Sequence, residues 1–83
     1  MILYFSAGWC SPCKMFKPVL QEVASELGIG IQYIDADQQK DLVSRYSVTS
    51  VPTLIVEKGG SVLFRNAGVM DKSRLRQVLS QFR

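Results

Sequence analysis

Residues 5–15 read FSAGWCSPCKM, and this stretch decides the fold. It lies where a short apolar run over residues 2–6 gives way to apolar residues at three- and four-residue spacing over about 11–27. The first pattern predicts a buried strand, and the second predicts an amphipathic helix. The two cysteines of the C-x-x-C motif, Cys10 and Cys13, are therefore expected where a strand ends and a helix begins.

The rest of the chain continues this alternation. The patterns predict a strand over 29–34, a short helix starting near residue 37 or 38, strands over 53–57 and 62–65, and a last helix over about 71–82. A long helical crossover predicts that the first two strands are parallel, and the Gly59-Gly60 turn predicts an antiparallel hairpin. We expect a single α/β domain over 1–83, whose elements follow one another along the chain as β-α-β-α-β-β-α. The four strands form one mixed sheet, and the three helices flank it.

Composition excludes several classes of function. The 83 residues include no histidine, which rules out imidazole catalysis and histidine-ligated metals, and we expect no cofactor. The net charge of +3 is spread along the chain. The basic residues of the last helix are expected to form a solvated face, with no nucleic-acid partner. No apolar run approaches the roughly 18 to 20 residues of a membrane span, and the N-terminus lacks a secretion signal, so a cytoplasmic protein is expected.

The cysteine pair carries the chemistry. At the start of a helix, free N–H groups and the positive end of the macrodipole stabilise the Cys10 thiolate, and Cys13 is within disulfide reach. A bridge over so short a loop stabilises little, which favours reactivity over a structural role. We expect Cys10 to be the nucleophile and Cys13 the resolving thiol. A zinc site is the alternative, but it needs about four ligands, and without histidine these would include carboxylates or a second chain.

Two segments carry a resemblance to a known family. Residues 5–15 resemble the active-site segment of thioredoxins, and residues 47–53, SVTSVPT, resemble their cis-proline segment. The resemblance extends through the Gly59-Gly60 turn and Gly68 to the last helix, and so covers nearly the whole chain. It implies a thioredoxin-like fold and the reduction of protein disulfides by dithiol–disulfide exchange. The implied partners are disulfide-containing proteins and a thioredoxin reductase, and we expect a monomer.

The resemblance also implies a set of substrate-binding residues. By analogy with the family, Pro52 is expected to be cis and to lie opposite the cysteines, while the backbone of Val51 pairs with bound substrate as an added strand. A shallow apolar groove beside Cys10 is expected from Trp9, Pro12 and the loop around Ala67-Gly68, and Ser11 completes the set of substrate-binding residues. Plain packing is the alternative for Trp9, and a simple turn is the alternative for Gly68.

Three departures from the family pattern affect these expectations. The chain begins at the strand before the active site, so the N-terminal strand and helix of full-length thioredoxins are expected to be missing, leaving four strands and not five. Tyr4 stands where many thioredoxins bury an aspartate thought to assist proton transfer, and Tyr33 stands where a lysine is common. A phenol with a pKa of about 10 is a poor base at neutral pH, so we expect Tyr4 to be a core aromatic.

The direction of the redox reaction depends on the residues between the cysteines. Ser11-Pro12 contains no histidine, which favours a reductant with a midpoint near −270 mV, about the value typical of thioredoxin. Two other functions stay open. One is a glutaredoxin-like reductase that uses glutathione, with Lys14 and Lys17 as candidate partners of its carboxylates. The other is a non-catalytic binding module with the same fold.

Overall fold

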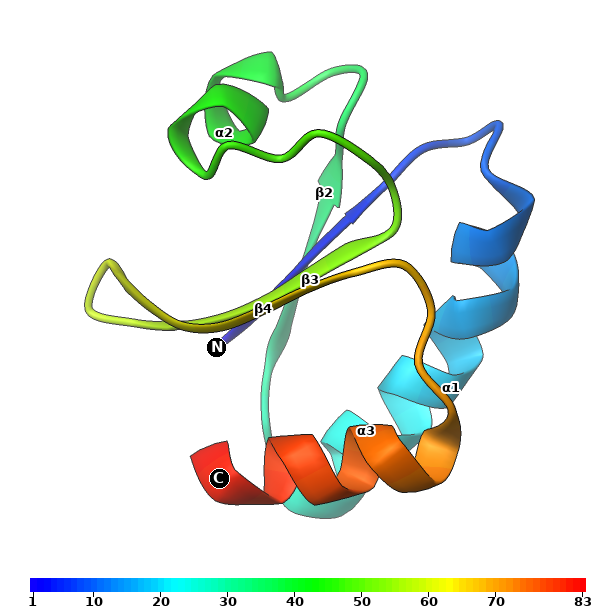
Figure 1. Ribbon diagram of the computed structural model, residues 1–83, viewed down its shortest axis with the longest axis vertical. Helices are drawn as coiled ribbons and strands as arrows, with labels where there is room; N and C mark the ends of the chain where they lie inside the picture. Colours follow the sequence, from blue (N-terminus) through cyan, green and yellow to red (C-terminus); the bar gives the residue numbers. More distant parts are fainter.

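The computed structural model describes all residues, 1–83, as one sheet with helices on both faces (Figure 1). Its elements are β1 (Ile2–Ser6), α1 (Ser11–Leu27), β2 (Ile31–Asp35), α2 (Lys40–Arg45), β3 (Thr53–Lys58), β4 (Ser61–Ala67), α3 (Lys72–Leu79) and a 3₁₀ turn (Ser80–Phe82). The strand order is β2-β1-β3-β4. The β1–β2 pair is parallel, and the β1–β3 and β3–β4 pairs are antiparallel. The predicted four-stranded mixed sheet with three helices is therefore confirmed.

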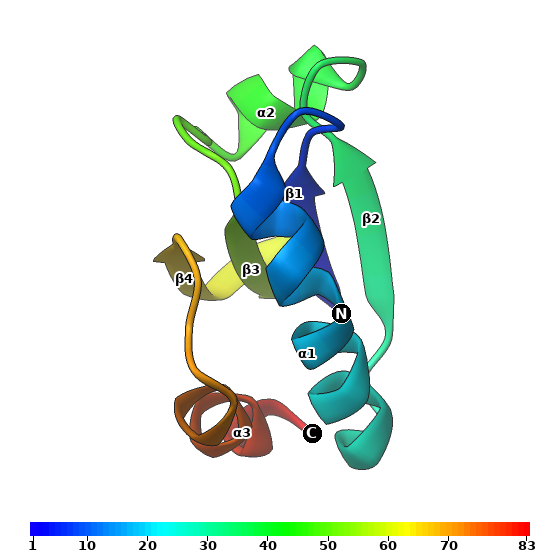
Figure 2. The same ribbon diagram turned by 90° about the vertical axis from the view of Figure 1, so that its right-hand side faces the viewer.

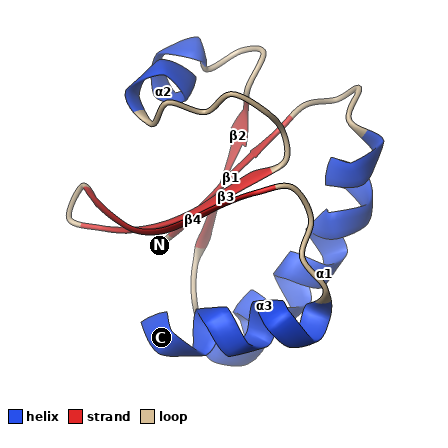
Figure 3. Ribbon diagram, viewed as in Figure 1, coloured by secondary structure: helices blue, strands red, loops and turns tan.

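The sheet separates two apolar layers. Helices α1 and α3 cover one face and α2 covers the other, which both views of the ribbon show (Figures 2 and 3). Alternate residues of β1 enter opposite layers, because successive strand side chains point to opposite faces. Tyr4 packs on the α1 side with Leu20 and Leu54, whereas Phe5 packs on the α2 side with Ile55. The strand that leads into the C-x-x-C motif is thus buried from both faces. None of the helices combines the length and apolar character that crossing a bilayer requires.

The fourth strand is longer than predicted, Ser61–Ala67, and the last helix ends in a 3₁₀ turn over Ser80–Phe82. Two other boundaries differ from the sequence prediction for identifiable reasons. The second strand begins at residue 31 and not 29, because the N–H of Ile29 bonds to the carbonyl of Ala24 and so completes the end of α1. Gly28 makes this ending possible with a φ of 70°. Helix α2 begins later than predicted, because the N–H groups of residues 38 and 39 both bond to the Asp35 carbonyl and form a turn first.

Candidate active site

The turn between β1 and α1 places Cys10 at the start of the helix. Cys10 is the N-cap residue of α1, and its own N–H bonds to the carbonyl of Ala7 at 3.1 Å. The backbone N–H of Cys13 donates to the Cys10 sulfur at 3.2 Å. Pro12 occupies the first turn, where its missing N–H leaves no bond unmade. The Cys10 Sγ therefore lies where a thiolate gains a donor and the positive end of the helix.

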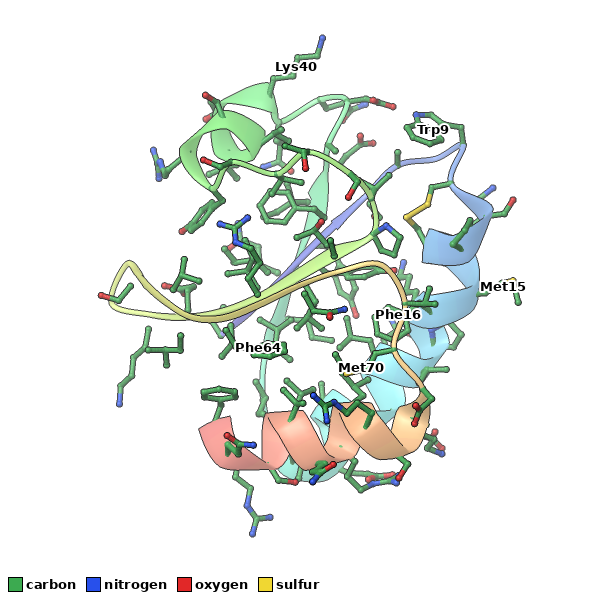
Figure 4. The ribbon with its side chains drawn as sticks, in the orientation of Figure 1. Trp9, Met15, Phe16, Lys40, Phe64 and Met70 are labelled. Carbon is green, nitrogen blue, oxygen red and sulfur yellow. A yellow bond between two sulfur atoms is a disulfide. The ribbon has the colours of Figure 1, made fainter.

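The two sulfurs form a disulfide across the first turn of α1, drawn as the yellow bond in Figure 4. The Cα atoms of Cys10 and Cys13 are 5.3 Å apart, within the range that a disulfide requires. Both residues are buried, with 4% and 2% of their surface exposed, and they pack with Ala7 and Val51. No group of three or more histidine, cysteine or acidic side chains gathers around a metal-sized site.

Two distant segments meet beside the disulfide. The Val51–Pro52 peptide bond is cis, and Val51 contacts the cluster that contains both cysteines. Gly68, at the end of β4, donates its N–H to the carbonyl of Pro52 at 2.8 Å. A φ of 95° at Gly68 is a conformation that other residues rarely adopt, so glycine is needed for this loop to approach Pro52. The structure thus brings Val51, Pro52 and Gly68 together next to the redox pair.

Trp9 and Pro12 line two separate hollows and not the single groove expected from the sequence, and Ser11 and Gly68 line neither of them. Trp9 is 70% exposed beside the disulfide (Figure 4) and shares a shallow, mostly apolar hollow of about 190 Å³ with Val51. Its indole Nε1 donates to the Asp37 carboxylate at 2.8 Å, which holds the ring in place. Pro12 lines a different apolar hollow of about 290 Å³ together with Met70, and Ser11 is exposed on the helix. Trp9 is therefore an exposed aromatic and not a packed one.

Tyr4 lies in the core as predicted, but its hydroxyl has a specific partner. The phenol is fully buried and donates to the carbonyl of Cys13 at 2.8 Å. Burial, followed by the neighbouring Tyr33, raises the pKa of Tyr4 to about 12. The phenol therefore stays protonated at neutral pH and accepts no proton. The sequence offered one signal for this bond, since a hydroxyl inside an apolar strand needs a partner.

A third hollow lies on the inner side of the redox pair, and we call it the Cys13 hollow. It has a volume of about 260 Å³, lies between β1, α1 and β2, and is lined by Cys13 together with polar and small residues. These residues are Tyr4, Ser6, Ala7, Gly8, Lys14, Lys17 and Asp35. Sequence reasoning assigned no role to Asp35 or Asp37, although carboxylates just after a strand often lie near a site at the same sheet edge.

A family model described as Thioredoxin matches residues 1–81 of the chain. Among curated proteins, thioredoxin of Chlamydia trachomatis is 40% identical over 82 residues, which cover 98% of this chain and 80% of that protein. Thioredoxin of Bacillus subtilis is 39% identical over 79 residues, which cover 93% of this chain and 76% of that protein.

Solved structures are similar in fold over almost the full chain. The N21Q mutant thioredoxin from Halobacterium salinarum superposes with a TM-score of 0.90 at 31% identity, covering 98% of this chain and 72% of that one. Plasmodium falciparum thioredoxin gives a TM-score of 0.85 at 30% identity, with coverage of 99% and 84%.

Proposed function

The chain belongs to the thioredoxin family and is a thiol–disulfide oxidoreductase that reduces protein disulfides; from this premise we propose that Cys10 attacks the substrate and Cys13 resolves the intermediate. The observation that carries this assignment is the hydrogen bond from the Cys13 N–H to the Cys10 sulfur at 3.2 Å. A donor at a helix N-terminus stabilises a thiolate, and the thiolate is the attacking species. Cys13 lies inside the first turn of α1, so it does not occupy the N-cap position that Cys10 holds.

The proposed reaction has two exchange steps. The Cys10 thiolate attacks one sulfur of the substrate disulfide, which forms a mixed disulfide and releases the other substrate sulfur as a thiolate. The Cys13 sulfur then attacks Cys10 after losing its proton. This step forms the Cys10–Cys13 bond and releases the second substrate thiolate. The substrate gains two electrons, and the protein is left as the disulfide seen in the structure.

We assign substrate recognition to the surface around the disulfide. The backbone of Val51 pairs with an extended substrate segment in the manner of an added strand, and Pro52 and Gly68 complete the support beneath it. The exposed ring of Trp9 and the helix residues Ser11 and Pro12 contact the substrate on the other faces of Cys10. The burial of Cys10 supports this arrangement, because a substrate must reach its sulfur over these neighbours.

The protein is further proposed to act as a monomer in the cytoplasm, with a thioredoxin reductase that returns it to the dithiol form. A reducing compartment keeps such a carrier in its active state. The family of the chain supports the choice of a reductase over glutathione as the electron donor.

The assignment of the two cysteines is tested by trapping the mixed disulfide. We expect Cys13→Ser to accumulate a covalent adduct with a disulfide-containing protein such as insulin, because its first step proceeds and its second cannot. Cys10→Ser is expected to form no adduct. The adducts are counted by mass spectrometry after acid quenching, and circular dichroism shows that both variants are folded. Adducts on Cys10→Ser alone would reverse the assignment, and adducts on neither variant would overturn it.

A further inference from the structure

The resolving step requires the Cys13 thiol to lose a proton in a buried position. Only 2% of Cys13 is exposed, and the residue belongs to the first turn of α1. The Tyr4 phenol from β1 donates to the Cys13 carbonyl and keeps its own proton with a pKa of about 12. Another group must therefore receive the Cys13 proton.

The Cys13 hollow supplies a route for this proton. Its volume of about 260 Å³ exceeds the roughly 30 Å³ that one water molecule occupies in the liquid, so it has room for several. Its polar lining provides hydrogen-bond partners for such waters. Cys13 borders this hollow and neither of the two apolar hollows beside Trp9 and Pro12.

Asp35 is the only carboxylate that lines this hollow. The other ionisable groups around it are Tyr4 from β1, Lys14 and Lys17 from α1, and Cys13 itself. At neutral pH lysine is a cation and has no site for a proton, so neither lysine can accept one. One carboxylate oxygen of Asp35 accepts the N–H of Asp37 at 2.9 Å, which orients the side chain. Both ion pairs of the structure lie elsewhere, between α1 and α3, and neither includes Asp35.

We propose that Asp35 accepts the proton of the Cys13 thiol through water in the Cys13 hollow during the resolving step. The inference rests on the proposed role of Cys13 as the resolving thiol. The thiol proton passes to a water molecule as that water passes a proton to the Asp35 carboxylate. The resulting Cys13 thiolate attacks the Cys10 sulfur, the Cys10–substrate bond breaks, and the substrate leaves as a thiolate. Asp35 then returns its proton to solvent or to the departing thiolate.

The test uses Asp35→Asn and an aromatic disulfide whose released thiolate absorbs visible light. Asparagine keeps an oxygen to accept the Asp37 N–H but cannot take the proton. Stopped-flow mixing of the reduced protein with this probe gives two releases of colour, first from attack by Cys10 and then from attack by Cys13. The first phase tests the proposed function, and the second tests the present inference.

We expect Asp35→Asn to leave the first phase unchanged and to slow the second about tenfold at pH 7, below the 10²–10⁴ of a directly positioned base. The difference should narrow as the pH rises, because a higher pH favours loss of the thiol proton without a base. Asp35→Glu should restore part of the rate. Asp41→Asn, which removes an exposed carboxylate from α2, is the charge-matched control and should behave as the parent protein.

The opposite result has a distinct physical meaning. If Asp35 acted only through its charge, its removal would lower the pKa of the Cys13 thiol, because a nearby anion disfavours the thiolate. The second phase would then become faster at pH 7. A second phase that is faster or unchanged therefore overturns the inference. Loss of the first phase in the parent protein would instead overturn the proposed role of Cys10.

Discussion

Tyr4 connects the core of the sheet to the redox turn through one hydrogen bond. Its ring packs with Phe16 at 6.1 Å between centroids and with Tyr33 at 6.4 Å, and its hydroxyl reaches the carbonyl of Cys13. A buried hydroxyl that lost this partner would be costly, so the bond fixes the position of the first turn of α1 against β1. The residue that replaces the buried acid of many thioredoxins is therefore a structural support for Cys13.

Tyr4→Phe should destabilise the oxidised protein by about 1 kcal/mol at pH 7.5, because the Cys13 carbonyl loses a buried donor. The sign of this effect should change at high pH. The unfolded chain ionises this phenol near its ordinary value of 10.0, whereas the folded chain holds it protonated to about 12. Between these pH values the parent protein should lose about 2–3 kcal/mol of stability that the variant keeps.

Urea unfolding at pH 7.5 and pH 11, with the disulfide intact, checks both parts of this prediction. At pH 11 the parent protein should have lost about 1.4 kcal/mol of stability relative to Tyr4→Phe, since that pH lies one unit above the unfolded pKa. A stability difference that is the same at pH 7.5 and pH 11 would contradict the raised pKa. Equal stabilities at pH 7.5 would contradict a contributing hydrogen bond.

Helix α1 is held at two ends by different means. Its first turn carries the redox pair against β1, and its C-terminal half is joined to α3 by two ion pairs. Glu26 accepts two hydrogen bonds from Arg76, at 2.9 and 3.1 Å, and Glu22 pairs with Lys72. The hydrogen bond from Arg76 is the main cause that lowers the pKa of Glu26 below its ordinary value of 4.5, and the charges of Arg76 and Lys72 add to it.

Glu26→Gln should cost a small amount of stability at pH 7, since the pair is exposed to solvent. A carboxyl whose folded pKa is lowered contributes stability above its unfolded pKa and loses it as the pH falls through the folded value. The difference in stability between the parent protein and Glu26→Gln should therefore disappear in acid, at pH values below the ordinary glutamate pKa of 4.5. Thermal unfolding from pH 3 to 7 measures it, with Asp41→Asn as the control. A difference that persists at pH 3 would show that the effect is not electrostatic.

At the scale of the whole molecule, the site forms where three separate parts of the chain converge. The turn before α1 and the cis-proline segment before β3 meet at the disulfide, and the loop after β4 bonds to Pro52 through the N–H of Gly68. The sheet order β2-β1-β3-β4 places β1 and β3 side by side in the centre, so the loops at their ends lie next to each other. The redox potential is a property of this assembly, because it compares the folded dithiol with the folded disulfide.

We expect the midpoint potential of the Cys10–Cys13 couple to lie near −270 mV, about the value typical of thioredoxin. The reason is that neither residue between the cysteines is a histidine that would add a cation and favour the dithiol. Titration in graded dithiol buffers, followed by Trp9 fluorescence and confirmed by thiol trapping, gives the value. A midpoint above about −200 mV would indicate an isomerase-like or glutaredoxin-like protein and would contradict this prediction.

The local features of this protein follow from its sequence alone. The bounds of β1 and α1 follow from hydrophobic periodicity and from Gly28, and the helix-start position of Cys10 follows from those bounds. Each of these depends on residues that are close in the chain. The two cysteines were recognisable for the same reason, since their chemistry depends on a spacing of three residues and on one helix end.

Only the tertiary structure decided which distant residues surround the redox pair. The contact of Val51 with the cysteines, the bond from Tyr4 to Cys13 and the presence of Asp35 beside Cys13 join residues on different strands and helices. No local pattern encodes such a neighbour, because it depends on strand order and on how α1 packs over the sheet. Local sequence thus places the two cysteines at one helix end, and the packing decides which side chains from other elements lie around them.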